Sequence, residues 1–356
     1  MMKYILNFAS MGNYRIGFVR EIQRELKGEL GIYSGTDASD RSIKTLQPAD
    51  VDFVSLRNRF FGNGFLIQSI PLLTFLKVDV LLMDLNPRFL HVWIVLLLRR
   101  LLGKRTLLWG HAWSAAGKGS RSDRIRGWQR SLGDGLVTYT RTQADEVRRA
   151  NPKIETYPAP NALYAIDQMR FEVNTVRNTV LYVGRLVDKK KPEELIKAFL
   201  AIADRIDPAI RLLMVGDGPA RKALEQLVDT AGMRARVSFA GHVDDIEVLR
   251  KYYAESLFSV SPGYVGLSIT QSFSFGVPML ISRHEIHSPE IEAAIEGENC
   301  EFFEYGEEGA FAHALQRMLE NEGTWRSRGP AIVKACQDRY SVESMAAGVI
   351  AALKGT

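Results

Sequence analysis

Short apolar runs alternate with helix-like segments along most of this chain. In the first half, the apolar runs predict strands, because they are brief and end at turn-forming residues; they are Tyr4–Phe8, Val78–Met83, Arg105–Trp109 and Leu136–Tyr139. Helices are predicted between them, over Phe18–Lys27, Phe89–Leu102 and Thr142–Ala150. Strands that alternate with helices indicate an α/β fold, with parallel sheets covered by helices on both faces.

The alternation stops near residues 160–176, which are polar and proline-containing, and then begins again. The second half predicts strands at Val180–Val183, Arg211–Val215, Val237–Ala240, Leu257–Val260 and Pro278–Ser282, with helices at Pro192–Ala203, Ala220–Thr230, Ile246–Ala254 and Leu267–Phe275. We therefore expect two doubly wound, Rossmann-like domains, residues 1–170 and 171–335, that face each other across a cleft. Residues 336–356 are expected to form a helix that packs back toward the first domain.

Charge divides the chain in the same way as the strand pattern. The net charge of the 356 residues is +5, but residues 1–172 carry +9 and residues 173–356 carry −4. Cys300 and Cys336 have no metal-type spacing, which favours a reducing compartment without disulfides. The N-terminus reads as a strand rather than a signal peptide, and the apolar run Phe89–Leu98 is too short to cross a bilayer. A cytoplasmic protein is expected, with the inner face of a membrane as a further location.

The densest basic stretch, Arg99 to Arg130, holds nine cations against Asp123 alone. One interpretation is a solvated surface, and the other is attraction to an anionic membrane or an acidic acceptor. The preceding segment Phe89–Leu102 has the same ambiguity, since it reads either as a core helix or as a helix on a membrane surface.

The segment that begins at Val180 is typical of an anion site. The strand Val180–Val183 ends at Gly184-Arg185, three lysines follow at 189–191, and a helix begins near Pro192. Glycine lets the backbone approach a ligand, while a helix N-terminus and cations attract negative charge. A second strand ends at Gly216-Asp217-Gly218, but the third glycine of a dinucleotide fingerprint is Arg221 here, which disfavours a dehydrogenase.

Taken together and in order, five blocks of the second half resemble the GT-B glycosyltransferases, in particular family 4 of retaining, nucleotide-sugar-dependent enzymes. The blocks are VGRLVDKK around Gly184, VGDGP around Gly216, VSFAGHV at Val237–Val243, SPGYVGLSITQSFSFGVPMLIS at Ser261–Ser282, and PEIEAAIEGEN from Pro289. The first half matches loosely, through Gly12, Trp109-Gly110-His111 and Pro160-Asn161. The resemblance implies a GT-B fold, no cofactor and no metal, with a nucleotide-sugar donor.

The resemblance also implies the residues of the site. Arg185 and Lys190 would neutralise the donor diphosphate, and His111 would lie beside the donor sugar. The residues expected to bind substrate are Gly12, Asn13, Gly184, Gly216, Gly241, His242, Val243, Tyr264, Gly266, Leu267, Ser268, Gln271 and Glu290. Fixed cations at the diphosphate stabilise the leaving group as the glycosidic bond breaks.

One departure from the family is large. The usual pair of glutamates, eight positions apart, falls on Gly263 and Gln271. Three interpretations are open: the sugar is held by other residues such as Tyr264 and Ser268, the alignment has slipped and Glu255 takes the role, or the chain is catalytically silent.

The function expected is therefore transfer of a hexosyl-type sugar from a nucleoside-diphosphate donor to an acceptor hydroxyl, with retention of configuration. A saccharide or lipid-linked acceptor in surface polysaccharide or glycolipid assembly is implied, and no nucleic acid. Two alternatives stay open, a nucleotide-sugar 2-epimerase and a non-catalytic nucleotide-sugar-binding protein.

Overall fold

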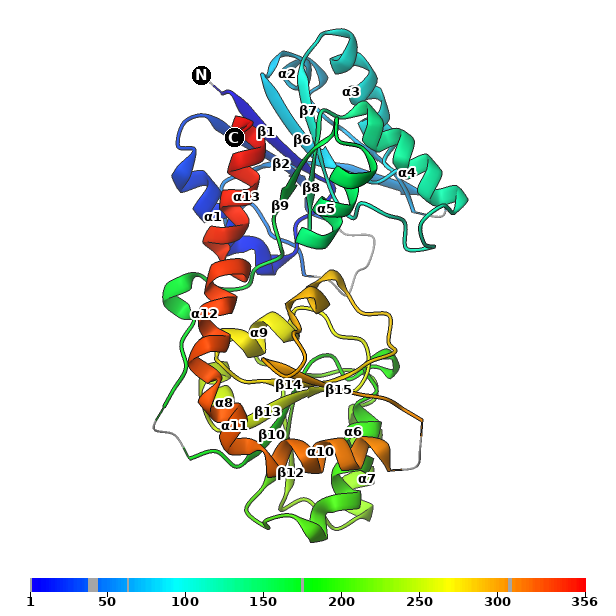
Figure 1. Cartoon of the computed structure of the whole chain (residues 1–356). Coiled ribbons are helices and arrows are strands. Elements are labelled where there is room, and N and C mark those ends of the chain that lie inside the picture. Colours follow the sequence, from blue (N-terminus) through cyan, green and yellow to red (C-terminus); the bar gives the residue numbers. More distant parts are fainter. Residues whose placement is uncertain (1, 38–43, 63, 174–175, 307–308) are drawn as a thin grey trace. The chain divides into compact units, whose positions relative to one another are not determined.

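The computed structural model describes residues 2–37, 44–62, 64–173, 176–306 and 309–356. The chain forms two compact units (Figure 1). Unit 1 comprises Met1–Leu163 together with Tyr340–Thr356, and unit 2 comprises Tyr164–Arg339. The first residue of unit 2, Tyr164, packs its ring 5.4 Å from that of Phe275.

Within its described residues, unit 1 contains a seven-stranded sheet in the order β3-β2-β1-β6-β7-β8-β9, and every pairing in it is parallel. The strands are β1 (Tyr4–Phe8), β2 (Leu30–Gly35), β3 (Val54–Leu56), β6 (Val80–Asp84), β7 (Arg105–Trp109), β8 (Gly135–Thr138) and β9 (Glu155–Pro158). Strand order reverses between β1 and β6, where Tyr4 pairs with Leu30 on one side and Val80 on the other. In doubly wound folds, ligands bind at this reversal, outside the carboxyl ends of the strands.

Helices cover this sheet, and an antiparallel hairpin of β4 (Asn58–Phe61) and β5 (Phe65–Gln68) adjoins it. The helices are α1 (Ile16–Glu25), α2 (Leu72–Lys77), α3 (Leu90–Leu101), α4 (Arg121–Leu132), α5 (Arg141–Ala150) and α13 (Val342–Lys354). Helix α13, drawn in red in Figure 1, contacts α1, β8 and β9. Its Gly348 passes so close to β9 that a Cβ there would lie 2.2 Å from the Pro158 carbonyl oxygen.

Within the described residues, the sheet of unit 2 has six parallel strands in the order β12-β11-β10-β13-β14-β15. The strands are β10 (Thr179–Val183), β11 (Arg211–Val215), β12 (Val237–Gly241), β13 (Ser256–Ser261), β14 (Met279–Ser282) and β15 (Cys300–Phe303). This is the 3-2-1-4-5-6 order of dinucleotide-binding folds, and its reversal lies between β10 and β13.

Helices surround this sheet and bury apolar side chains in the core of unit 2. They are α6 (Pro192–Ile202), α7 (Arg221–Thr230), α8 (Ile246–Ala254), α9 (Ser268–Ser274), α10 (Ala310–Glu320), α11 (Glu322–Ser327) and α12 (Gly329–Tyr340). Phe199 of α6, Phe258 of β13 and Leu315 of α10 are fully buried in one cluster. Helix α12 ends at Tyr340, where the chain returns to unit 1.

The predicted α/β class with two doubly wound domains is confirmed by these two parallel sheets and their covering helices. The bounds of β1, β7, β11 and α8 agree with the sequence pattern, and most other predicted elements differ by one or two residues. The pattern did not identify α4, because its outer face is charged and its apolar positions are few. Nor did it identify β2, whose apolar residues are interrupted by glycine and serine, or the four-residue strands β9 and β15.

Candidate functional site

The carboxyl ends of β10, β11 and β12 are joined by backbone contacts. The N–H of Gly184 donates to Val215 O at 2.9 Å, and that of Gly216 donates to Gly241 O at 2.7 Å. Gly216 has φ 141°, and a Cβ there would lie 1.9 Å from the Gly184 carbonyl oxygen. Because no side chain fits, glycine at 216 is required for the two turns to meet. The structure thus brings Gly184, Gly216 and Gly241 together.

The turn after β10 presents its cations at the reversal of strand order. Arg185 is exposed, Lys189 and Lys190 end a 3₁₀ turn, and Lys191 adopts a left-handed conformation (φ 49°) before Pro192 opens α6. Lys190 is half-buried. Burial, with the charges of Lys189 and Arg185, lowers the pKa of Lys190 to about 8, and Glu290 opposes that shift. Cations that repel one another in a half-buried turn favour an anionic ligand.

Tyr264 lies beneath these lysines. Its ring centroid is 4.7 Å from the Nζ of Lys190 and 4.9 Å from that of Lys189. The N–H of Tyr264 donates to Lys189 O at 2.9 Å, which joins the end of β13 to the turn after β10. Two predicted residues, Lys190 and Tyr264, are therefore neighbours at the point where a doubly wound sheet binds its ligand.

Gly263, the position predicted to replace the first glutamate of the family, has no room for a side chain. A Cβ at this position would lie 2.5 Å from the carbonyl oxygen of Lys189 and 2.7 Å from the carbonyl carbon of Lys190. Backbone of the lysine turn occupies the space that a side chain at 263 would need. The slipped alignment, with Glu255 in its place, is wrong, because Glu255 immediately precedes β13 and its carbonyl accepts from Asn178 and Thr179 at the amino-terminal edge of the sheet.

Gln271, the residue predicted to stand at the second glutamate position, is held by two tyrosines. Its Nε2 donates to the Tyr164 hydroxyl at 2.8 Å, and its Oε1 accepts from the Tyr253 hydroxyl at 3.3 Å. Burial raises the pKa of both tyrosines, so both hydroxyls stay protonated. One amide proton and one lone pair of Gln271 remain beyond these two bonds, which fits a hydroxyl-bearing ligand.

Glu290 and its neighbours border the same region. Glu290 is buried and accepts a hydrogen bond from the Ser288 hydroxyl. A Cβ on Gly266 would lie 3.7 Å from Ser288 Oγ and 4.0 Å from Lys190 Nζ, which places Gly266 between them. Leu267 and Ser268 follow directly, at the start of α9. The structure therefore brings Lys190, Gly266, Ser288 and Glu290 together.

His287 was not identified from the sequence, although it positions this segment. Its Nδ1 accepts from the N–H of Val265 at 3.1 Å, so Nε2 carries the proton and donates to Ser282 O at 2.8 Å. Burial lowers the pKa of His287, which keeps the ring neutral. A histidine two residues before the recognised Pro289-Glu290 pair was the available signal.

His242 and Val243 lie at the other end of the site, after β12. His242 is exposed, with Nε2 3.8 Å from an Asp244 carboxylate oxygen. Gly241 has φ 75°, and a Cβ there would lie 3.2 Å from the Arg221 guanidinium. In the sheet, β11 lies between β12 and β10. The turn after β12 is linked to the turn after β11 by the hydrogen bond from the Gly216 N–H to Gly241 O.

In unit 1, Gly12, Asn13 and His111 all follow carboxyl ends of strands. Gly12 has an ordinary φ of −65°, and a Cβ there would lie 2.6 Å from the Tyr14 ring. The N–H of Asn13 donates to Lys44 O at 2.9 Å, so it already has an acceptor within unit 1. The exposed His111 ring lies 5.0 Å from the ring of Tyr139.

Two further polar residues lie at the β1–β6 reversal of unit 1. Arg15 is buried among aromatic rings and donates to Tyr139 Oη and Asn161 Oδ1, both at 3.2 Å. Asp84 accepts from the N–H of Ala9 at 2.6 Å, and burial raises its pKa to about 6 against that bond and the charge of Arg15. Asp84, the last residue of β6, was not identified from the sequence, although it directly follows the predicted strand Val78–Met83.

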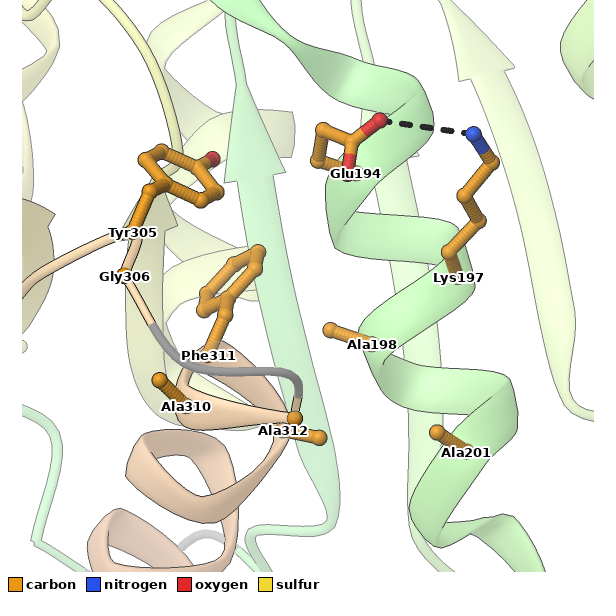
Figure 2. A pocket seen from close by; sticks show the side chains of 10 residues that line it. Glu194, Lys197, Ala198, Ala201, Tyr305, Gly306, Ala310, Phe311 and Ala312 are labelled. Atoms are coloured by element: carbon orange, nitrogen blue, oxygen red, sulfur yellow. Dashed lines mark hydrogen bonds and ion pairs between the residues drawn. The ribbon is translucent and has the colours of Figure 1, made fainter.

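A separate hollow of unit 2, about 650 Å³ in volume, lies along α6 and α10 (Figure 2). Of the ten described residues that line it, Glu194 and Lys197 carry charge, and they pair with each other at 3.4 Å. Figure 2 shows alanines and two aromatic rings around them. This lining offers little to a diphosphate, in contrast to the strand ends.

The described residues include neither a bilayer-spanning helix nor a cluster of metal ligands. No helix there combines the length and apolarity needed to span a bilayer. Nor do three or more His, Cys, Asp or Glu side chains of those residues gather as metal ligands would.

Comparison with known proteins agrees with the geometry. The whole chain superposes on Anabaena Alr3699/HepE in complex with UDP with a TM-score of 0.73, 15% identity and full coverage of both chains. It superposes on the lipopolysaccharide outer core galactosyltransferase WaaB with a TM-score of 0.65 and 13% identity, covering 100% of this chain and 99% of that one. These likenesses show the fold: the chain has the GT-B architecture.

Residues 177–321 match the family described as "Glycosyl transferases group 1". A lipopolysaccharide core biosynthesis glycosyltransferase, LpsE of Rhizobium meliloti (strain 1021), is 26% identical over 166 residues, 47% of this chain and 46% of that protein. The N-acetyl-alpha-D-glucosaminyl L-malate synthase of Bacillus anthracis is 22% identical over 175 residues, 49% and 45% of the two chains. The match thus spans about half the length of these relatives. The predicted resemblance to GT-B glycosyltransferases is confirmed.

Proposed function

We propose that this protein transfers a hexosyl-type sugar from a nucleoside-diphosphate donor to an acceptor hydroxyl. The observation that carries the proposal is the meeting of the Gly184–Lys190 turn with the Gly263–Gly266 segment at the strand reversal of unit 2. Arg185 and Lys190 neutralise the diphosphate as the bond to the sugar breaks. The match of residues 177–321 to glycosyl transferases group 1 supports this assignment.

The remaining roles follow from position. Gln271 and Ser268 hold the ribose, the Gly241–Val243 turn borders the base, and Tyr264 with Glu290 borders the sugar. Position 263 contributes backbone alone, so the sugar is held without the usual first carboxylate. In unit 1, we propose that Gly12 and Asn13 complete the phosphate pocket and that His111 contacts the donor sugar.

We propose that the reaction retains the anomeric configuration and proceeds without cofactor or metal. Side-chain cations do the work that a divalent ion does elsewhere. The leaving phosphate itself takes the proton of the acceptor hydroxyl, which a front-face mechanism allows. Unchanged turnover in EDTA and an α-configured product from an α-configured donor would support this; loss of turnover on chelation would refute the metal-free mechanism.

The acceptor class rests on the relatives. LpsE is named for lipopolysaccharide core biosynthesis, and a saccharide or lipid-linked acceptor in surface polysaccharide or glycolipid assembly is proposed for this chain. The +9 charge of residues 1–172 supports an acidic acceptor or an anionic membrane for unit 1. A cytoplasmic enzyme at the inner face of a membrane would meet both.

The first test is thermal stabilisation by a panel of nucleoside diphosphates and nucleotide sugars. A shift from one diphosphate is expected, and Arg185→Ala with Lys190→Ala should abolish it. The matched control is Lys222→Ala with Lys251→Ala, which removes two exposed lysines of unit 2 outside the site. Full turnover by the Arg185/Lys190 variant would refute the roles given to these two residues. Binding of a nucleotide sugar without transfer to any acceptor would instead favour a non-catalytic nucleotide-sugar-binding protein.

A further inference from the structure

Helix α3 is apolar on both of its faces. Its inner face, which includes Val92, Val95 and Leu96, is fully buried in the core of unit 1. Its outer face repeats the apolar pattern, with Ile94 at 55%, Leu97 at 51% and Leu101 at 84% exposure. A helix that is apolar all round is normally surrounded by apolar material, and here one side is open to solvent.

The exposed apolar surface continues beyond the helix. Leu102, the residue after α3, is 58% exposed, and Trp128 on α4 is 68% exposed. Arg100 Nη1 donates to Ser131 O at 3.1 Å, which holds the ends of α3 and α4 side by side (Figure 1). We call Ile94, Leu97, Leu101, Leu102 and Trp128 the α3 face.

A basic hollow of about 580 Å³ adjoins the α3 face. Its lining combines four cations with two carboxylates: Arg100, Lys104, Arg105 and Lys153 with Asp134 and Glu155, together with Gly103. Arg105 pairs with Glu155 at 2.6 Å, and Asp134 accepts from the Thr106 N–H at 2.7 Å. Lys104 pairs with Asp79 at 3.2 Å, so Arg100 and Lys153 are the cations of this lining that are exposed beside the leucines.

Arg99, in the same basic run, does not contribute to this surface. It is fully buried and donates to the Thr106 hydroxyl. It also donates to four backbone carbonyls, those of Phe75, Val78, Asp79 and Arg105. Its charge belongs to the fold of unit 1, whereas Arg100 and Lys104 border the α3 face.

We propose that the α3 face and the basic hollow together bind the surface of an anionic lipid bilayer. The leucines and Trp128 enter the boundary between headgroups and acyl chains, where tryptophan is favoured, and the cations meet lipid phosphates. A second copy of the chain is the other candidate occupant. A two-fold contact would bring two basic hollows together, and their mutual repulsion favours the bilayer.

This inference deepens the membrane contact of the proposed function and rests on it for its biological setting. The geometry that carries it is independent of the donor site. The experiment measures co-sedimentation of the full chain with vesicles of phosphatidylcholine alone and of phosphatidylcholine with phosphatidylglycerol. The intact protein is expected to bind the mixed vesicles more tightly, and salt is expected to weaken that binding.

Two variants divide the surface into its parts. Leu97→Ser with Leu101→Ser should weaken binding to mixed vesicles by about tenfold or more, because two apolar side chains no longer leave water. Arg100→Gln with Lys153→Gln should remove most of the preference for anionic lipid. The matched controls are Ile286→Ser, 92% exposed in unit 2, and Lys222→Gln with Lys251→Gln.

The inference would be overturned if the leucine variant and the cation variant both bound vesicles as tightly as the intact protein. It would also be overturned by a dimer in light scattering that the leucine variant dissociates, since the occupant would then be a second copy. The diphosphate thermal shift is measured on the same samples without lipid. If the diphosphate raises the melting temperature but the protein does not bind vesicles, the docking surface alone is refuted. If the protein binds vesicles but the diphosphate gives no thermal shift, the donor site alone is refuted.

Discussion

Gly263→Ala tests whether the lysine turn takes the place of the usual glutamate. The added methyl group would lie 2.5 Å from Lys189 O, and 2.7 and 2.9 Å from the carbonyl and α carbons of Lys190. These are backbone atoms, so relief requires the turn itself to move. That movement would carry the ammonium of Lys190 away from Tyr264, whose ring centroid is 4.7 Å distant.

Two magnitudes follow. Forcing one methyl group into a filled space costs about 1–3 kcal/mol of folding free energy. For a unit the length of Tyr164–Arg339, each kcal/mol corresponds to about 2–4 °C, so the melting temperature should fall by about 2–12 °C. Displacing one charge-assisted bond to a phosphate, worth about 1.5–3 kcal/mol, should weaken diphosphate binding by about 10- to 100-fold.

The assay is calorimetric: thermal unfolding for stability, and titration with the diphosphate that stabilises the intact protein. Gly266→Ala is the matched control, since a Cβ there would meet its nearest neighbours at an ordinary 3.6 to 4.0 Å. We expect it to melt near the temperature of the intact protein. A Gly263→Ala protein that melts like the Gly266→Ala protein and binds the diphosphate like the intact protein would refute the claim that the turn fills position 263.

Two other predictions concern buried cations. The folded pKa of Lys190, about 8, lies below its ordinary 10.5, so the unfolded chain binds more protons between these values and the stability of unit 2 should rise with pH there. The affinity for diphosphate should instead fall as pH rises through 8, because binding requires the ammonium form of Lys190. Titration calorimetry should find proton uptake on binding near pH 8, and Lys190→Met should abolish that uptake. Equal proton uptake by the variant would assign the proton to another group. Arg99→Lys replaces a guanidinium that donates to five acceptors with a single ammonium group. The free energy of unfolding of unit 1, measured in urea, should therefore fall by about 2–5 kcal/mol, whereas Arg100→Lys should change it little.

The alternation of strands and helices was enough to predict the fold class. Runs such as Tyr4–Phe8 and Arg211–Val215 are buried strands with the predicted bounds, because parallel strands covered on both faces are continuously apolar. The turn at Gly184–Lys190 was equally visible, since glycine and cations follow a strand directly. Asp84 was visible by the same rule and was missed.

Other features depend on contacts between segments far apart in the chain. Nothing near Gly263 in the sequence indicates that the backbone of Lys189 and Lys190 fills the space beside it. Arg99 reads as one more surface cation beside Arg100, and its burial becomes clear only from the carbonyls that surround it. Gln271 could be aligned with a glutamate, but its two tyrosine partners, Tyr164 and Tyr253, lie on different segments.

The return of the chain to unit 1 has a consequence for biosynthesis. Residues up to Leu163 are synthesised before unit 2, yet α13, which covers α1, β8 and β9, is synthesised after it. Unit 2 is continuous in sequence and can fold while unit 1 still lacks α13. Unit 1 would spend that interval with the surface around Gly17 and Pro158 uncovered, which makes it the part of the nascent chain that most needs chaperone protection.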